Sequence, residues 1–175
     1  LYQYGNEANP EIHYTTTGPE ILEDVPDITH FVAGLGTSGT LMGVGRYLKE
    51  QNPTIQILAV EPPSGESVEG LRSLEDGFIP PVFEQWNGID LLDGKRIIRP
   101  IESLECARKL AQTSGIFAGI SSGAALAGAL RVAEQIKSGN IVFIVCDGGW
   151  KYLSTEAWTK PIDEVAESIN RIIYF

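Results

Sequence analysis

One stretch decides the fold: THFVAGLGTSG, residues 29–39. Its first five residues are dense in β-branched and aromatic side chains, which indicates a short strand. The glycines that follow indicate a tight loop. Apolar residues then recur at helical spacing, at Leu41, Val44, Tyr47 and Leu48. The stretch therefore predicts a strand, a glycine-rich loop and a helix in direct succession.

The rest of the chain continues this alternation. Asn52-Pro53 ends the first helix, and residues 55–61 are rich enough in branched side chains for a strand that is buried on both faces. Two further strands are predicted at residues 96–99 and 141–145. Strands that alternate with helices predict an α/β fold with a doubly wound parallel sheet.

Two helices are expected between the last two strands. Ser103 is predicted to cap the first, and the second is predicted to begin at Ser121 or Ser122 and to run to about residue 138. Residues 62–94 are rich in glycine, proline and acidic side chains, and we expect a long loop there.

The domain organisation follows from these elements. Residues 1–160 are predicted to form one cofactor-binding α/β domain, and residues 161–175 a C-terminal amphipathic tail. The apolar residues that share one helical face of this tail are Ile162, Val165, Ile169 and Ile172.

The composition predicts a soluble protein. The chain has 175 residues, 43% of them hydrophobic, and 13 Lys and Arg against 23 Asp and Glu give a net charge of −10. This acidity disfavours nucleic acid as a partner, and no apolar run approaches the ~20 residues of a membrane span. Two cysteines, Cys106 and Cys146, allow no disulfide framework and fit a reducing cytoplasm. His13 and His30 are too few and too far apart for a metal site, so we expect both to be structural.

The glycine loop has three interpretations. Residues 34–39 fit the pattern GxGxxG, and Glu61 stands about 20 residues further on at a strand end, which favours a nicotinamide-dependent oxidoreductase. Amides at a helix N-terminus bind any phosphate, however, and extra hydroxyls at this turn favour a terminal phosphomonoester. These hydroxyls belong to Thr37, Ser38 and Thr40. In the third interpretation the turn only packs a helix on a strand.

Two further segments stand where a strand gives way to a helix. Residues 118–125 contain Ser121, which either caps a helix or directs its hydroxyl toward a ligand. Residues 146–155 follow the last strand; Cys146 there is expected to be a small buried residue rather than a nucleophile, and Asp147 receives no role. Because the carboxyl ends of parallel strands share one edge, all three loops are predicted to line one crevice.

Five motifs occur in order along nearly the whole chain. They are YQYGNEANPEIH (2–13), TTGPEI (16–21), GTSGT (36–40), GISSGA (119–124) and YLST (152–155). Together they resemble the cysteine synthase family, pyridoxal-phosphate β-replacement enzymes related to cystathionine β-synthase. The resemblance covers roughly the second half of such an enzyme. It implies the large domain of a fold-type II pyridoxal-phosphate enzyme, incomplete at its N-terminus, in a chain that begins inside a longer protein.

The resemblance implies the cofactor-binding residues. The glycine loop would cradle the phosphate of pyridoxal 5'-phosphate, and Glu61 would then meet no ribose. Ser121 matches a serine at the pyridine nitrogen, where a neutral hydroxyl favours loss of a β-leaving group over transamination. Gln3 matches a glutamine near the substrate carboxylate and the ring hydroxyl. The loop residues implied to bind the phosphate are Gly36, Thr37, Ser38, Gly39 and Thr40.

The resemblance also bears on the substrate. The stretches closest to the O-phosphoserine-using branch are residues 65–74, 76–78 and 149–151. The matched Arg72 would bind the substrate phosphate, since a guanidinium binds phosphate through two hydrogen bonds. The alternative is a surface arginine paired with Glu69 or Glu75. The implied reaction is β-replacement on O-phosphoserine or O-acetylserine through an aminoacrylate, with sulfide or a thiocarboxylated carrier protein as sulfur donor, in a cytoplasmic homodimer.

Three departures from the family pattern stand out, one of them at Cys146-Asp147, where the family often has proline or serine. Ser38 replaces a more usual glycine, which we expect only if its φ is negative. The six lysines do not match the family's Schiff-base lysine, so residues 1–175 contain no catalytic residue and are expected to be inactive alone. A non-catalytic module that keeps the cofactor fold is the corresponding alternative function.

Overall fold

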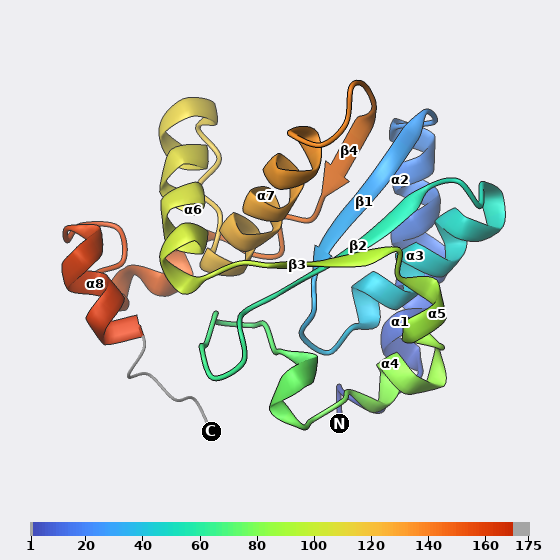
Figure 1. The fold of residues 1–175 in the computed structure, drawn as a ribbon, viewed down its shortest axis with the longest axis horizontal. Coiled ribbons are helices and arrows are strands. Elements are labelled where there is room, and N and C mark those ends of the chain that lie inside the picture. The colour runs from blue at the N-terminus through green and yellow to red at the C-terminus, as the bar shows by residue number, and fades with distance from the viewer. Residues whose placement is uncertain (1, 170–175) are drawn as a thin grey trace.

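The computed structural model describes residues 2–169. Four parallel strands form one sheet in the order β3-β2-β1-β4 (Figure 1). Their bounds are β1 Ile28–Gly34, β2 Gln56–Glu61, β3 Gly94–Ile97 and β4 Asn140–Phe143. The chain adds β2 and β3 on one side of β1 and β4 on the other, which confirms the doubly wound parallel sheet.

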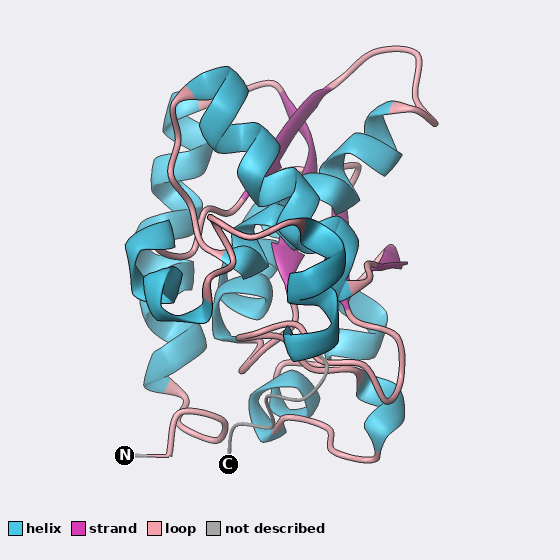
Figure 2. Ribbon diagram, turned by 90° about the vertical axis from the view of Figure 1, so that its left-hand side faces the viewer, coloured by secondary structure: helices cyan, strands magenta, loops and turns pink. Residues whose placement is uncertain are grey.

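Helices cover both faces of the sheet, as Figures 1 and 2 show. On one face lie α1 (Ala8–Ile12), the π-helix η1 (His13–Thr17), α2 (Gly18–Asp24), α3 (Gly39–Gln51), α4 (Pro81–Gln85) and α5 (Gly88–Leu91). On the other lies α7 (Ile120–Ala133); α6 (Pro100–Ser114) packs against α7, and α8 (Ile162–Ile169) packs against α6. Two 3-10 helices complete the described elements, η2 (Leu74–Asp76) and η3 (Gly149–Thr155).

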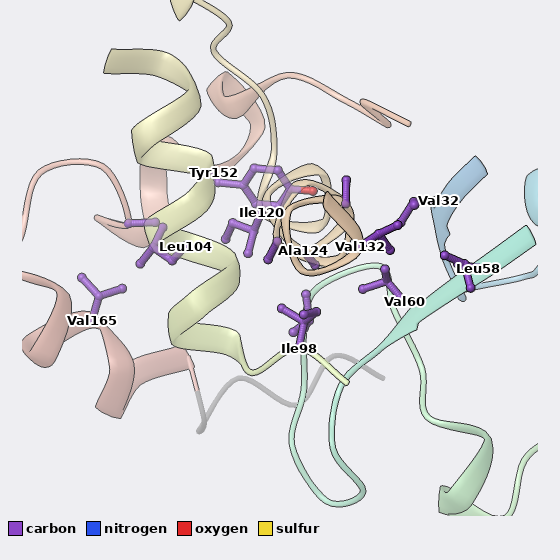
Figure 3. Close-up of a cluster of buried hydrophobic side chains, with 14 residues drawn as sticks. Val32, Leu58, Val60, Ile98, Leu104, Ile120, Ala124, Val132, Tyr152 and Val165 are labelled. Atoms are coloured by element: carbon purple, nitrogen blue, oxygen red, sulfur yellow. The ribbon is translucent and has the colours of Figure 1, made fainter. Parts of the chain in front are cut away.

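Successive side chains of the central strands enter two separate cores. Phe31 and Ile57 pack in the core on the α3 face, whereas Val32 and Leu58, one position further along each strand, pack in the core on the α7 face. Figure 3 shows the second core, where Val32 of β1 lies near α7. Burial on both faces explains why these strands read as continuous apolar runs rather than as alternating patterns.

The third strand lies two residues earlier than predicted. Pro100 opens α6, and Arg99 is the extended residue that precedes it, so the strand ends at Ile97. Ser103 is therefore not a helix cap. Its hydroxyl donates a hydrogen bond of 2.7 Å to the carbonyl of Ile120, which joins α6 to α7 inside the core.

The boundaries of α7 and β4 also differ from the prediction. Gly119 is the residue before α7, so neither Ser121 nor Ser122 caps it. The helix ends at Ala133 rather than near residue 138, because the chain turns there and Ile136 packs back onto the core. Strand β4 ends at Phe143 instead of residue 145.

Residues 62–94 are not a single long loop. They contain η2, α4 and α5, each of five residues or fewer. Helices of this length are too short to produce a helical repeat in the sequence, and α4 begins instead with the local signal of a proline in its first turn.

Helix α8 lies within the predicted tail. Its Val165 is buried in the core that also contains Leu104 of α6 (Figure 3). Ile172, predicted on the same helical face, lies outside the described residues, and the division at residue 160 stays a prediction. Within residues 2–169, no helix is both long enough and apolar enough to cross a membrane.

Candidate active site

The glycine loop joins the end of β1 to the start of α3. Within residues 2–169, the backbone N–H groups of Thr37 and Ser38 have no hydrogen-bond acceptor. They lie at the N-terminus of a 13-residue helix, where the helix dipole adds partial positive charge. Unpaired amides at such a position bind anions, phosphate groups above all.

Ser38 adopts a left-handed backbone conformation, with φ 68° and ψ 0°. This corrects the expectation of a negative φ. The turn from β1 into α3 requires that conformation, although a residue with a Cβ atom adopts it at a cost of roughly 1–2 kcal/mol. Ser38 is buried, and its hydroxyl donates a 2.5 Å hydrogen bond to the carbonyl of Thr37.

A comparison of two substitutions isolates this backbone strain. Ser38→Gly and Ser38→Ala both lose the hydroxyl, but only glycine adopts a positive φ without a steric penalty. We expect the glycine variant to unfold with a free energy about 1 kcal/mol higher than the alanine variant, measured by urea denaturation. Two variants of equal stability would show that Ser38 is not strained.

The three loops at the strand ends line one cavity of about 300 Å³. This confirms their predicted convergence. The glycine loop forms one wall, the start of α7 a second, and the segment after β4 a third. The lining residues are Gly34, Gly36, Thr37, Ser38, Gly39, Thr40, Gly70, Leu71, Ser121, Cys146, Asp147, Lys151 and Tyr152.

Ser121 and Cys146 lie together on the wall formed by α7 and the end of β4. Ser121 is 6% exposed, and the hydroxyl of its neighbour Ser122 accepts a 3.0 Å hydrogen bond from the Cys146 amide. Cys146 itself is exposed, which corrects the expectation of a buried residue: β4 ends before it, so it stands at the cavity mouth. Although the residue as a whole is exposed, partial desolvation of its thiol raises the pKa of Cys146, which keeps the thiol protonated.

Asp147 has contacts that the sequence did not reveal. Its Oδ2 accepts a 2.7 Å hydrogen bond from the Tyr152 hydroxyl, and the Lys151 ammonium lies 3.5 Å from the same oxygen. Burial, followed by this hydrogen bond, raises the pKa of Tyr152, so Tyr152 stays protonated as the donor. Tyr152 also belongs to the α7-face core (Figure 3), and it therefore fixes Asp147 to the body of the domain.

The two candidate substrate residues do not line this cavity. Arg72 lines an adjoining cavity of about 210 Å³, and Gly70 and Leu71 form part of both walls. The Nε atom of Arg72 donates a 3.0 Å hydrogen bond to the Tyr4 hydroxyl. The guanidinium carbon lies 5.4 Å from the centre of the Tyr4 ring and 5.7 Å from that of Phe78.

Arg72 carries no ion pair within the described part of the chain, which disfavours the alternative of a surface pair with Glu69 or Glu75. The carboxylate of Glu75 lies instead 3.8 Å from the ammonium of Lys95. Gln3 lies near the glycine loop, because Asn9 donates both to the Gln3 carbonyl at 2.9 Å and to the Thr37 hydroxyl at 3.0 Å.

Glu61 has a structural role that explains its position. The side chain is completely buried, and its Oε1 lies 2.6 Å from the ammonium of Lys95. Its Oε2 accepts a 3.0 Å hydrogen bond from the Leu74 amide. Both carboxylate oxygens are therefore engaged, which disfavours the ribose contact that a nicotinamide cofactor would need.

The cavity fits pyridoxal phosphate better than a metal ion. Unpaired amides and two threonine hydroxyls suit a phosphate group, and the Ser121 hydroxyl on another wall suits a neutral hydrogen bond to a ring nitrogen. Within residues 2–169, no group of three His, Cys, Asp or Glu side chains is placed to hold a metal.

Comparison with known proteins identifies the family. The family described as "Pyridoxal-phosphate dependent enzyme" matches residues 1–147. The chain belongs to this pyridoxal-phosphate-dependent enzyme family. The cofactor of this family is pyridoxal phosphate rather than a nicotinamide, and the match supports the resemblance drawn from the five motifs.

Two curated relatives within this family are both named cysteine synthase B. The protein from Pseudomonas aeruginosa is 41% identical over 161 residues, which cover 89% of this chain and 51% of the relative. The protein from Escherichia coli is 42% identical over 156 residues, which cover 89% of this chain and 50% of the relative. The chain thus spans about half the length of these relatives.

Solved structures show the same fold. An O-acetyl serine sulfhydrylase isoform 3 from Entamoeba histolytica superposes with a TM-score of 0.81 at 28% identity, covering 95% of this chain and 52% of that one. An O-acetylserine dependent cystathionine beta-synthase from Helicobacter pylori gives 0.77 at 37% identity, covering 91% and 52%. The architecture is therefore that of fold-type II pyridoxal-phosphate enzymes.

Three cavity residues were not among the predicted site residues, although the sequence analysis singled out the segments in which they lie. Gly70, Lys151 and Tyr152 reach the cavity from segments that periodicity does not describe. His13 was expected to be only structural, yet its Nε2 lies 3.0 Å from the Thr40 hydroxyl. A signal was present in this case, because Asn9 and His13 stand four residues apart, the spacing of one helical face.

Proposed function

We propose that the full-length protein makes cysteine by β-replacement on O-phosphoserine, with pyridoxal 5'-phosphate as cofactor. One observation carries this proposal: a cavity with an anion-binding loop and a buried serine hydroxyl adjoins a second cavity that holds an arginine without an ion pair. A cofactor phosphate and a substrate phosphate would thus have separate sites.

The residues of the first cavity suit the cofactor. The amides and hydroxyls of the glycine loop, residues 36–40, would hold its phosphate, and the Ser121 hydroxyl would meet its ring nitrogen. Bound pyridoxal phosphate supplies the electron sink that lets a β-leaving group depart from an amino acid. Because Ser121 carries no charge, it would leave the ring nitrogen without a full proton, which favours β-replacement over transamination.

The residues around the second cavity suit a phosphorylated substrate. Arg72 would bind the leaving phosphate through the nitrogens that Tyr4 leaves free. On a chain of net charge −10, such a local guanidinium is needed to attract a dianion. Gln3, near the glycine loop through Asn9, would lie at the substrate carboxylate and the ring hydroxyl.

The lysine that carries the cofactor would come from residues outside these 175. Among the described residues, Lys151 is the lysine that lines the cavity, and its ammonium lies 3.5 Å from the Asp147 carboxylate. An amine in an ion pair is a poor nucleophile, so residues 1–175 would be inactive alone.

One experiment on the full-length protein tests this function. After removal of bound cofactor, cysteine formation from O-phosphoserine and sulfide is expected to return with pyridoxal phosphate and not with NAD. Borohydride then fixes the cofactor to its lysine, and peptide mapping is expected to place that lysine outside residues 1–175. Recovery with NAD, or a label on Lys151, would contradict the proposal.

The remaining predictions concern the whole protein. The homodimer, the cytoplasmic location and the choice between sulfide and a sulfur-carrier protein stay predictions that rest on the resemblance. The relatives named cysteine synthase B support the cysteine-forming reaction without deciding among these.

A further inference from the structure

The helical stretch α1-η1 lies directly against the glycine loop. Two glycines of α3, one turn apart, allow this approach. A Cβ atom at Gly39 would lie 2.0 Å from Oδ1 of Asn9, and one at Gly43 would lie 2.2 Å from the Pro10 carbonyl and 2.8 Å from the His13 Cβ. The last glycine of the GxGxxG pattern is therefore needed for contact with Asn9.

Two side chains of this stretch bond to the two threonines of the loop. Asn9 Nδ2 donates to the Thr37 hydroxyl at 3.0 Å, and His13 Nε2 lies 3.0 Å from the Thr40 hydroxyl. On its other side, His13 Nδ1 lies 2.9 Å from the Thr17 hydroxyl. Each loop hydroxyl thus has one partner on the stretch α1-η1, and the Thr37 hydroxyl also accepts a 3.4 Å hydrogen bond from the Gly39 amide. Both threonines line the cavity.

The direction of the first bond follows from the amide group. The Nδ2 group of Asn9 has two hydrogens and no acceptor site; one hydrogen is donated to the Gln3 carbonyl and the other to Thr37. The Thr37 oxygen must therefore accept, which leaves its own hydrogen free. A phosphate oxygen in the cavity would accept that hydrogen.

The direction of the second hydrogen bond, between His13 and Thr40, is determined when an anion occupies the cavity. Burial lowers the pKa of His13, so the ring is neutral and one nitrogen donates while the other accepts. With the proton on Nε2, Thr17 donates to Nδ1, Nε2 donates to Thr40, and the Thr40 hydrogen is free for the anion. With the proton on Nδ1, Thr40 would donate to the ring and present only lone pairs to the phosphate.

We infer that Asn9 and His13 are positioning residues that turn the hydroxyls of Thr37 and Thr40 into hydrogen-bond donors toward the cofactor phosphate. This inference rests on the proposed function and adds to it the residues that fix the polarity of the phosphate site. In the chain Thr17, His13, Thr40, an anion in the cavity would favour the imidazole tautomer with the proton on Nε2. Asn9 orients the Thr37 hydroxyl with a side chain that does not titrate.

The test compares two ligands that differ only in the phosphate. Affinities of the full-length protein for pyridoxal phosphate and for pyridoxal are measured by equilibrium dialysis. Asn9→Asp replaces the donating NH₂ with an acceptor of the same shape, and His13→Leu removes both ring nitrogens. We expect each variant to bind pyridoxal phosphate about tenfold more weakly and pyridoxal within about twofold of wild type.

Matched controls separate this effect from general damage. Asn6→Asp adds the same charge three residues earlier, where the side chain only accepts a hydrogen bond from the Ala8 amide, and should change neither affinity. His13→Gln keeps a donor near the Nε2 position and should restore most of the affinity for pyridoxal phosphate. Since His13 acts through Thr40, His13→Leu should add little to the loss caused by Thr40→Val.

The outcomes separate a failure of this inference from a failure of the proposed function on which it rests. A parallel loss for both ligands, or additive losses for His13→Leu and Thr40→Val, would mean that His13 only supports the fold. Wild-type binding of pyridoxal phosphate with all variants unchanged would overturn the inference alone. Failure of the wild-type protein to bind pyridoxal phosphate would overturn the proposed function and this inference with it.

Discussion

Replacing Arg72 with alanine in the full-length protein is expected to lower kcat/KM for O-phosphoserine by about 100-fold. The guanidinium is held by the Tyr4 hydroxyl, lies over two aromatic rings and lines the cavity of about 210 Å³, so its remaining nitrogens would be available to a phosphate there. Loss of a paired, charge-assisted contact with a phosphate removes about 3 kcal/mol, which is a rate factor of this size. O-acetylserine carries no phosphate, and its kcat/KM should change by less than about threefold.

Two further variants sharpen this result. Arg72→Lys keeps the charge but loses the planar pair of donors, and we expect an intermediate loss with O-phosphoserine. Arg99→Ala removes an exposed arginine that is paired with Glu66 and lines neither cavity, so both substrates should react normally. Equal losses for the two substrates in Arg72→Ala would exclude Arg72 as the phosphate ligand.

Replacing Lys95 with methionine is expected to reduce the free energy of unfolding by about 3 kcal/mol. Lys95 is the cation beside Glu61, whose carboxylate is completely buried at a distance of 2.6 Å. A buried carboxylate without its partner is strongly destabilising, because burial removes its hydration without compensation. Urea denaturation measures the loss.

The control for Lys95 is a lysine pair at the surface. Lys160 lies beside Glu156 with both side chains about half exposed, and Lys160→Met should cost less than about 0.5 kcal/mol. Changing Glu61 to glutamine in the Lys95→Met background should recover most of the stability. A loss for Lys95→Met no larger than that for Lys160→Met would mean that Glu61 is not held by this pair.

The sequence predicted those features of the fold that rest on local patterns. The pattern of residues 29–48 predicted the strand, the glycine loop and the helix, because β-branched residues, glycines and helical spacing are each typical of one of these structures. Helices α4 and α5 were missed because five residues or fewer are too short for a repeat. The φ of Ser38 was predicted with the wrong sign, because the connection of β1 to α3, rather than side-chain preference, sets that backbone angle.

The sequence predicted only part of the site, because some of its contacts follow from the sheet topology and others from tertiary packing. Convergence of three loops follows from the topology of a parallel sheet, so Thr37 and Ser121 could be placed in one cavity from the order of elements alone. The contacts of Asn9 and His13 join residues 28 and 27 positions apart in the chain. The packing of α1 and η1 against α3 brings these pairs together. The four-residue spacing of Asn9 and His13 shows that the two share a helical face, but not what that face contacts.

The π-helix η1 joins α1 to α2 in one continuous helical segment and changes the direction in which its side chains point. A π turn takes more residues than an α turn, so the side chains after Thr17 are rotated about the helix axis relative to those before His13. Before the π turn, Asn9 bonds to the glycine loop. After it, Ile21 and Leu22 pack against the core on the α3 face of the sheet. Deleting one residue between His13 and Thr17 would regularise the helix, and Asn9 and the pair Ile21 and Leu22 would then no longer reach their present partners at the same time, so the length of this turn is constrained as well as its residues.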